Sequence, residues 1–191
     1  MKRLSLTRYR HQAAILLKEI RYGNPEALQR IQQLDLFSSS DLSDLPHLVK
    51  LKHCLNVMAL EQGFRQWADF TSDFETSVMD ELAARYSAGY LNHWYASYDE
   101  AKRLLEESRE SPQRYLLPYK KGRQSQYYIC EAAYIRSFGL DPDAREWEAI
   151  GYDLVQPRDR KARLSLLDSW VEGQFSKPIT QPANRRREVR S

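Results

Sequence analysis

A histidine and a cysteine in the second half of the chain, His93 and Cys130, are residue types that can form a nucleophilic pair. In such a pair the imidazole takes the thiol proton, and a carboxylate such as that of Glu131 or Asp99 orients the ring. The alternative is structural: a tyrosine or a backbone carbonyl holds the imidazole, and the cysteine packs as a small apolar side chain. Sequence spacing does not show whether the two residues approach each other, so a small hydrolase or transferase remains one functional hypothesis.

A second pattern interleaves aromatic and cationic side chains between residues 115 and 128. Tyrosines can stack on a nucleic-acid base or on an aromatic ring of a peptide, and neighbouring cations attract an acidic partner. Alternation along a strand places Tyr127 and Tyr128 on opposite faces of a sheet, so at most one of them joins the core. The structural alternative to a recognition surface is that these tyrosines only cover a small sheet. The pattern predicts a recognition surface made of Tyr115, Tyr119, Lys120, Lys121, Arg123 and Tyr127.

The other titratable residues do not match the spacing of a metal site. His53 and Cys54 are adjacent, so on a helix they point about 100° apart and do not converge on one ion. His47 and His53 miss the four-residue spacing that places two imidazoles on one helix face. The acidic residues between 141 and 153 lack the central glycine and terminal glutamate of a calcium loop. Sequence motifs for a phosphate-binding loop, a serine nucleophile elbow and a zinc protease are missing as well. We therefore predict no metal and no cofactor.

Composition places the chain among ordinary globular proteins, because 42% of its 191 residues are apolar and 29% are charged. Two cysteines are too few for a disulfide scaffold. No apolar stretch approaches the ~20 residues of a membrane-spanning helix. The basic start, Lys2-Arg3, is not followed by an apolar signal core. The sequence therefore predicts a cytoplasmic protein without a membrane partner.

The net charge of +3 is unevenly distributed along the chain. Residues 177–191 hold five cations and one glutamate, which gives +4 and leaves −1 for residues 1–176. Residues 176–191, rich in Pro, Gln, Asn and Arg, cannot bury enough surface to offset their ordering entropy, so we predict a disordered basic tail. The first 22 residues are also basic and include Arg8 and Arg10. We expect these two arginines to contribute to a cationic contact surface.

Apolar residues at helical spacing predict that the first half of the chain is helical. Thr7 is the expected N-cap of the first helix, and Gly23-Asn24-Pro25 separates it from the second. The longest regular pattern runs from Leu45 to Gln62 and ends at Gly63. A short helix over residues 64–70 and a longer one over residues 73–86 complete this half.

After Gly89 the pattern changes, and the aromatic-rich run 90–96 is consistent with a strand. The β-rich runs 115–119 and 126–130 flank a polar turn with Gly122 and predict a hairpin, with Pro118 favouring an edge strand. Helices are predicted around the hairpin, over residues 99–108, 131–138, 142–150 and 158–175. The change near residue 88 predicts a helical module over residues 1–87 and a small α+β module over residues 88–175.

The run L-K-H-C-L-N-V-M-A-L-E-Q-G-F-R-Q-W-A-D-F, residues 51–70, resembles a bacterial helical signature of the form A-x-x-x-G-F-x-x-W-x-x-[LF]. The matching residues are Ala59, Gly63, Phe64, Trp67 and Phe70. This signature occurs in small helical modules attached to diverse partners, including some glyoxalase-superfamily and ankyrin-type proteins. The resemblance covers about a tenth of the chain and implies a helical module with no chemistry of its own. The run is also similar to the first half of a helix-turn-helix, but the residues after Gly63 offer few side chains that would contact bases.

These patterns together predict a mainly helical α+β fold, with an N-terminal helical module followed by a small antiparallel sheet and its supporting helices. The function they favour is a non-catalytic interaction module that binds a protein or a nucleic acid through its aromatic and basic side chains. A nucleic-acid-binding regulator, with a basic tail that adds phosphate affinity, is the first alternative. The second is the hydrolase or transferase built on His93 and Cys130.

Overall fold

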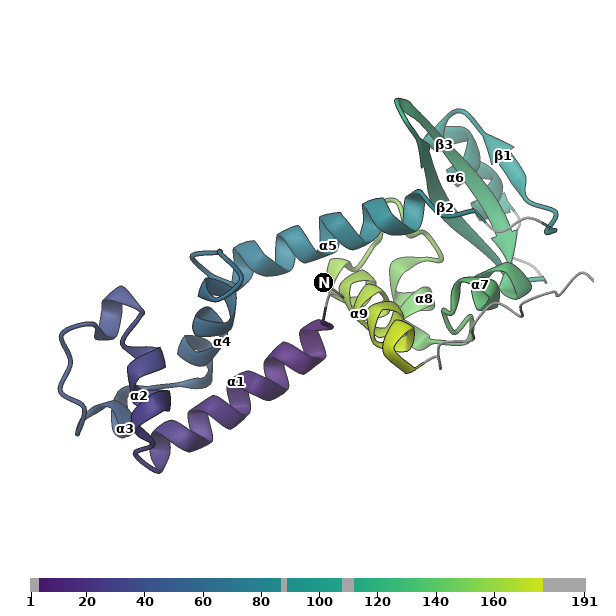
Figure 1. The fold of residues 1–191 in the computed structure, drawn as a ribbon. Helices are drawn as coiled ribbons and strands as arrows, with labels where there is room; N and C mark the ends of the chain where they lie inside the picture. Colours follow the sequence, from purple (N-terminus) through teal and green to yellow (C-terminus); the bar gives the residue numbers. More distant parts are fainter. Residues whose placement is uncertain (1–3, 87–88, 108–111, 177–191) are drawn as a thin grey trace, which may run out of the picture.

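A computed structural model describes residues 4–86, 89–107 and 112–176 of the chain. These residues form nine α-helices, one short 3₁₀ helix and a three-stranded antiparallel sheet, which confirms the predicted mainly helical α+β fold. Four of the helices lie at one end of the molecule, the sheet lies at the other, and a long helix connects them (Figure 1). The predicted basic tail lies outside the described residues from position 177 onward. No helix in these three ranges is long and apolar enough to cross a lipid bilayer.

The helical end begins with α1 (Leu6–Arg21) and α2 (Pro25–Ile31), and the 3₁₀ helix η1 (Asp35–Phe37) follows. The N-cap of α1 is Ser5 and not Thr7 as predicted, because the Ser5 hydroxyl accepts a hydrogen bond from the Arg8 backbone N–H at 3.2 Å. Asn24 caps α2 by accepting from two backbone N–H groups, as its position before Pro25 implies.

The predicted single helix over Leu45–Gln62 is wrong, because the structure has two helices there, α3 (Leu45–Leu48) and α4 (Leu51–Leu60). Val49 and Lys50 adopt extended backbone between them. The side chain of His53 makes the new helix start possible, since its Nδ1 accepts the Lys50 backbone N–H at 3.1 Å. Apolar residues continue at helical spacing through the break, so their periodicity alone does not reveal it.

Helix α5 (Trp67–Ala83) replaces the two helices predicted for residues 64–70 and 73–86. It starts where Asn56 of α4 accepts the Trp67 backbone N–H at 3.0 Å. Gly63 turns the chain between α4 and α5 with a φ of +85°, a conformation that favours glycine. The resulting long helix runs from the helical end of the molecule to the sheet (Figure 1).

The sheet consists of β1 (His93–Tyr95), β2 (Arg114–Lys121) and β3 (Gln124–Glu131) in the order β1-β3-β2. The predicted hairpin of β2 and β3 is confirmed, and its ladder extends to the pair Lys121 and Gln124. Gly122 begins the two-residue turn with a φ of +60°. On the outer side of β2, Leu116 exchanges backbone hydrogen bonds with Tyr152 and Leu154 at 2.9 and 3.0 Å, so residues 152–154 run along part of this edge.

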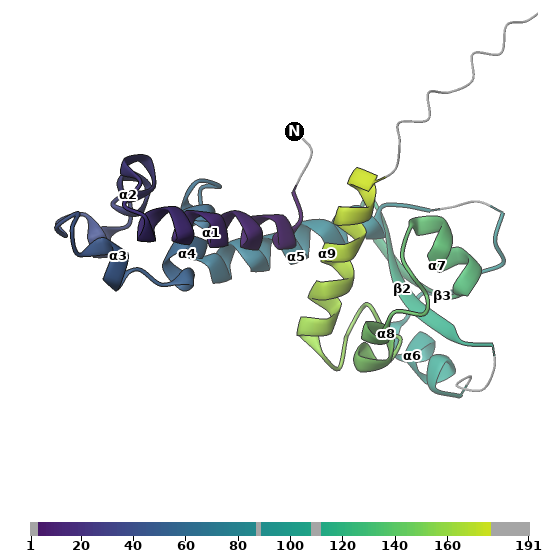
Figure 2. The same ribbon diagram turned by 90° about the horizontal axis from the view of Figure 1, so that it is seen from below.

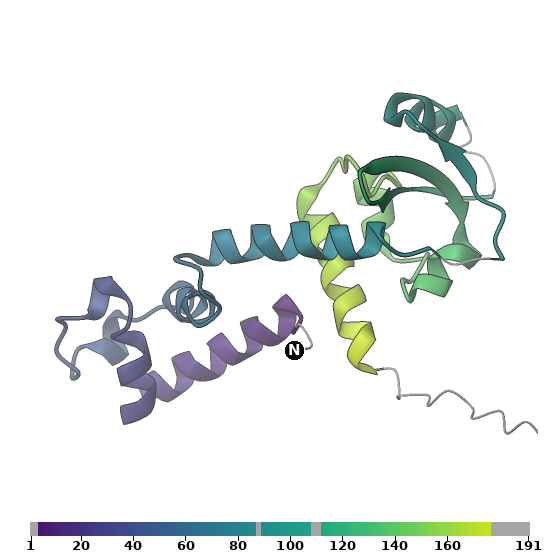
Figure 3. The same ribbon diagram turned by 45° about the horizontal axis from the view of Figure 1, so that its top comes forward.

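The two faces of the sheet are covered by different helices. Helix α6 (Tyr98–Glu107) packs on one face, where Ala101 and Leu105 contact Leu116 and Ile129. The opposite face meets α5, α7 (Ala132–Phe138) and the buried side chains that follow it. Figure 3 shows the strands as a curved layer at the end of α5, with α6 on its outer side. Side chains of adjacent strand residues therefore enter two separate clusters.

Helices α8 (Arg145–Ile150) and α9 (Arg160–Ser176) pack together beside the sheet. Helix α9 also contacts α5 and lies beside the start of α1 (Figure 2). One cluster of buried apolar side chains consequently extends from Leu6 of α1 to Val171 of α9. The predicted modules 1–87 and 88–175 share this core.

Candidate functional site

Large apolar side chains collect on the sheet face near the end of α5. Tyr86, just beyond α5, is 47% exposed, and Trp94 of β1 is 38% exposed. Tyr90 and Leu91 lie between them in sequence and are also exposed, and Tyr119 of β2 is partly exposed. We call these five residues, Tyr86, Tyr90, Leu91, Trp94 and Tyr119, the aromatic surface.

Three rings of the aromatic surface contact one another at large interplanar angles. The Trp94 and Tyr119 ring centroids are 5.2 Å apart at 81°, and those of Tyr86 and Trp94 are 5.6 Å apart at 53°. The Tyr86 and Tyr119 rings are 6.2 Å apart at 68°. Such tilted pairs are favourable contacts between aromatic rings, so the three side chains hold one another in place.

Buried rings support the exposed ones from below. The Trp94 ring lies 4.9 Å from the ring of Tyr128, which in turn lies 5.4 Å from Tyr134. Tyr128 and Tyr134 are 0% and 1% exposed. Burial raises the pKa of the Tyr128 phenol far above its ordinary value, so this ring stays neutral. The aromatic surface is therefore the outer layer of a packed and uncharged ring cluster.

The strand register explains why these rings share a face. Trp94 is directly opposite Tyr128, and alternation along β2 places Tyr119 and Lys121 on one side of that strand. Lys121 and Arg123 are exposed at the hairpin end and make no ion pair with any described residue. Lys120 differs, because its Nζ lies 3.2 Å from Asp80 Oδ1 on α5. Lys121 therefore lies on the same side of β2 as Tyr119 of the aromatic surface, and Arg123 follows it in the turn.

Of the predicted recognition residues, the structure brings Tyr119, Lys121 and Arg123 together at this end of the hairpin. Tyr115 is not part of the surface: it is 2% exposed, and its hydroxyl donates to the Pro142 carbonyl at 2.9 Å. Its register opposite Cys130 turns it toward the face covered by α7 and α8. Tyr127 lies on the other face, where its ring is 5.8 Å from that of Tyr98 on α6.

The predicted arginines of the first helix lie elsewhere. Arg8 Nε is 3.0 Å from Glu172 Oε1, and Arg10 Nη1 is 3.7 Å from Asp168 Oδ2, both on α9. Figure 2 shows this start of α1 beside α9 and away from the hairpin. Arg8 and Arg10 therefore belong to the α1–α9 contact and not to one surface with Lys121 and Arg123.

His93 and Cys130 do not meet in this structure. His93 pairs with Ile129, so its side chain is on the α6 side of the sheet, where it is exposed. Cys130 points to the opposite face, is 1% exposed and donates its thiol hydrogen to the Tyr115 carbonyl. Burial raises the pKa of the Cys130 thiol well above its usual range, so the reactive thiolate is disfavoured. The sheet separates the two members of the predicted nucleophilic pair.

The other cysteine, Cys54, is also a buried apolar side chain. Burial raises the pKa of the Cys54 thiol to about 11, and the side chain is fully buried in α4. Among the described residues, no three His, Cys, Asp or Glu side chains come together in a way that would hold a metal ion.

Sequence reasoning missed Tyr86, Tyr90, Leu91 and Trp94 as surface residues. The sequence predicts the run 90–96 as a strand that holds a candidate catalytic histidine, and the excess of aromatic residues in this run is the available signal for a surface. What the sequence does not show is that β1 spans only three residues, which leaves the preceding segment outside the ladder.

Comparison of the chain with models of known protein families, with curated proteins and with solved structures finds no match. The chemistry of the aromatic surface and the fold around it are thus the basis for a functional proposal.

Proposed function

We propose that the chain is a non-catalytic interaction module that binds an extended acidic and apolar segment of a partner protein at the aromatic surface. The observation that carries this proposal is the mutual ring contact of the exposed Tyr86 and Trp94 with Tyr119. Lys121, two residues along β2 from Tyr119, makes no ion pair with a described residue. Tyrosine, tryptophan and arginine are the residues most often found where a few side chains supply most of the binding energy. A supported ring cluster also loses little side-chain entropy on binding.

The edge of the sheet supports an extended partner segment. β1 pairs with β3 on one side, and within the described ranges no strand covers its other side. An exposed edge strand can hydrogen-bond to a peptide that adds to the sheet, while neighbouring side chains contact alternate residues of that peptide. The Trp94 side chain projects from this strand, so backbone pairing and ring contacts would involve the same partner segment.

A protein partner suits the surface better than a nucleic acid does. Stacking on bases needs free ring faces, but here the Trp94, Tyr119 and Tyr86 rings turn their edges and faces toward one another. Phosphate binding also needs a series of cations, and Lys120 is already paired with Asp80. The predicted cations Arg8 and Arg10, which would extend such a series, lie at the α1–α9 contact.

Selection from a displayed library of random linear peptides tests this proposal with a defined ligand. We expect the selected peptides to combine alternating apolar residues with Asp or Glu, and to shift the backbone NMR signals of β1 and of Tyr119. The variants Trp94→Ala and Tyr119→Ala should each weaken the selected peptide at least tenfold, about 1.4 kcal/mol or more. The matched control is Tyr22→Ala, which removes an 80% exposed tyrosine next to α1 at the helical end.

A single-stranded oligonucleotide serves as the opposing ligand in the same assay. If it binds the aromatic surface with a steep salt dependence while no peptide is selected, the nucleic-acid alternative replaces this proposal. Equal peptide affinity of the Trp94→Ala and Tyr22→Ala variants would contradict the location of the site.

A further inference from the structure

A pocket lies between the end of α6 and the turn that follows α8. Its volume is about 260 Å³, below the range of roughly 300–1,000 Å³ that is usual for pockets of drug-sized ligands. Its lining combines charged and polar side chains, including Gln113, Glu148 and Arg158, with apolar surface such as that of Leu105 and the Tyr152 ring. None of these residues belongs to the aromatic surface. The size and lining indicate a small polar ligand.

The backbone that forms one wall of the pocket has an unusual conformation. Gly151 and Tyr152 have φ angles of +71° and +58°, and Tyr152 is the one non-glycine residue with a positive φ among the described residues. Such a conformation costs on the order of 1 kcal/mol or more for a residue with a side chain and occurs often at ligand sites. Backbone hydrogen bonds maintain this conformation. The Tyr152 N–H donates to the Trp147 carbonyl at 2.8 Å, and the Tyr152 carbonyl accepts from the Leu116 N–H at 2.9 Å.

Asp153 fixes the same wall from behind. Its carboxylate is fully buried and accepts hydrogen bonds from the Tyr98 hydroxyl at 2.7 Å and from Lys102 Nζ at 3.0 Å. The backbone N–H groups of Val155 and Gln156 donate to the other oxygen at 2.9 and 3.0 Å. Four donors therefore satisfy this carboxylate, and the chain around Tyr152 is held to α6 as well as to β2.

Arg158 lies directly over Gly151. A Cβ atom on residue 151 would come within 3.0 Å of Arg158 Nε and 3.2 Å of its Cδ, so the glycine both permits the turn and leaves room for the arginine. The Arg158 guanidinium makes no hydrogen bond or ion pair with any residue in the described part of the chain. A pocket wall thus presents a cation whose side-chain hydrogen-bond donors are not used by any described residue.

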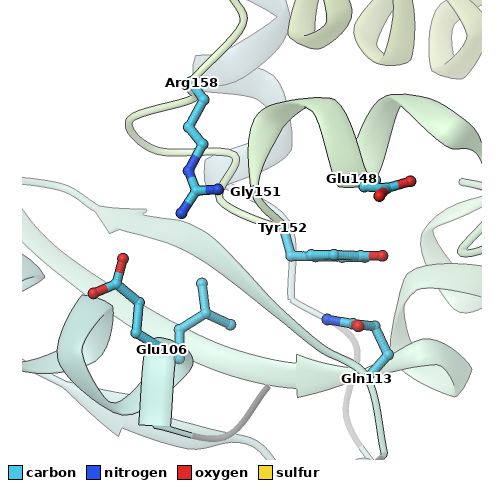
Figure 4. A pocket seen from close by; sticks show the side chains of 7 residues that line it. Glu106, Gln113, Glu148, Gly151, Tyr152 and Arg158 are labelled. Atoms are coloured by element: carbon cyan, nitrogen blue, oxygen red, sulfur yellow. The ribbon is translucent and has the colours of Figure 1, made fainter. Parts of the chain in front are cut away.

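The pocket has a carboxylate at each end of the Tyr152 ring and a guanidinium at one end, where Glu106 Oε1 also lies 3.9 Å from Lys102 Nζ. In the view of Figure 4, Arg158 and Glu106 lie on one side, and Glu148 and Gln113 lie near the hydroxyl end of the tyrosine. Glu148 forms no ion pair with a described residue. A ligand with only a negative charge would be repelled by the carboxylates, and a ligand with only a positive charge would leave the Arg158 guanidinium without a counter-charge.

We propose that this pocket binds a small zwitterion whose carboxylate and cationic group are separated by several bonds, as in an ω-amino acid, a basic amino acid or a dipeptide. The carboxylate pairs with the planar guanidinium of Arg158, for which two parallel hydrogen bonds are the favoured geometry. The cationic group pairs with Glu148 at the other end. The chain between the two charges packs along the face of the Tyr152 ring.

Titration of the full chain with ε-aminocaproate, followed by NMR, tests the proposal. We expect a saturable shift of the Gly151 and Tyr152 signals at millimolar ligand or below. Caproate, which lacks the cation, and hexylamine, which lacks the carboxylate, should each bind at least about tenfold more weakly, because each forms only one of the two charge pairs. Parallel titrations with lysine and with a glycine-containing dipeptide show whether the pocket prefers a basic amino acid or a dipeptide.

Variants locate the binding at the two ends of the pocket. Arg158→Gln and Glu148→Gln should each lower the affinity for ε-aminocaproate about tenfold or more, and both residues are exposed, so we expect the fold to be retained. Arg145→Gln, an exposed arginine at the start of α8 that does not line the pocket, is the matched control. Trp94→Ala should leave this affinity unchanged, which separates the pocket from the aromatic surface.

Three results would overturn the proposal. One is the lack of any saturable shift at Gly151 and Tyr152 with ε-aminocaproate, lysine or the dipeptide. The second is binding of caproate or hexylamine as tight as that of ε-aminocaproate, which would show that one charge is sufficient. The third is an affinity in Arg158→Gln and Glu148→Gln equal to that in Arg145→Gln.

Discussion

His53 determines where a helix begins and does so with a titratable group. Its Nδ1 atom accepts the Lys50 backbone N–H, and its ring packs edge to face on Phe37 at 4.9 Å. Partial burial is the main cause that lowers the pKa of His53, and the charges of Lys52 and Lys50 lower it further. Protonation of Nδ1 would remove the acceptor and place a third cation at this helix start, so the folded protein favours the neutral ring.

The depressed pKa of His53 predicts a pH dependence of stability. Because the folded protein binds this proton more weakly than the unfolded chain does, the contribution is complete above the ordinary pKa of about 6.5 and is lost as the pH falls below it. We expect the free energy of unfolding to decrease between about pH 6.5 and 5 more in the wild type than in His53→Gln, whose amide keeps an acceptor but does not titrate. Urea denaturation of both proteins over this pH range measures the difference. Parallel pH profiles would show that His53 does not contribute.

The N-terminus of α1 depends on a contact with a helix that is distant in sequence. The first turn of α1 is satisfied by α9, because the Asp168 carboxylate accepts the Thr7 N–H at 3.0 Å and the Thr7 hydroxyl at 2.7 Å, as well as the Leu6 N–H. Asp168 is only 6% exposed. Negative charge at a helix N-terminus is favourable, and two otherwise unpaired donors gain an acceptor.

Removal of this carboxylate should therefore destabilise the protein through α1. We expect Asp168→Ala to lower the free energy of unfolding by about 1–3 kcal/mol, since it leaves helix N–H groups in a buried position without an acceptor. Asp168→Asn, which keeps one acceptor oxygen, should have a smaller effect. Chemical denaturation gives the values, with Ser169→Ala on the exposed side of α9 as the control. A change in Asp168→Ala no larger than in Ser169→Ala would contradict the role of Asp168.

Some of these elements could be predicted from the sequence and others could not. The hairpin was predictable because β-rich runs, a turn glycine and Pro118 all lie within a short segment. The helix break at Val49 was not, since apolar periodicity passes through it and the deciding contact is a histidine side chain. Thr7 seemed a suitable cap from its local neighbours, but its own hydroxyl donates to a residue 161 positions later.

The candidate sites also depend on contacts between residues that are far apart in the sequence. Whether Tyr115, Tyr119 or Tyr127 is exposed depends on which helices cover each face of the sheet, and alternation alone does not specify this. Strand alternation predicts that Tyr127 and Tyr128 lie on opposite faces of the sheet, and the register of β3 confirms this. The pocket of Arg158 arises from the pairing of residues 152–154 with β2, which no sequence pattern in that segment indicated.

At the scale of the whole molecule, the two ends are joined through α5 and α9. Glu75 of α5 is 3% exposed, and its carboxylate pairs with Arg160 Nε at 2.7 Å and with Arg163 Nη2 at 2.7 Å on α9. Arg163 also donates to the Val155 carbonyl at 3.1 Å beside the pocket wall. A buried carboxylate with two guanidinium partners is strongly tied to this one arrangement, because separation of the helices would leave its charge unpaired.

This arrangement predicts that the helical end and the sheet end unfold together. The shared core from Leu6 to Val171, the Asp168 contact and the Glu75 pairs each cross between them, so neither end can open without exposing surface of the other. We expect pulsed hydrogen exchange across a urea series to show one common midpoint for peptides from α4 and from β3. Glu75→Ala should lower both midpoints by the same amount, with Thr76→Ala, an exposed neighbour on α5, as the control. If α4 loses protection at a distinctly lower urea concentration than β3, the helical end is an independent unit and the contacts through α9 do not couple it to the sheet.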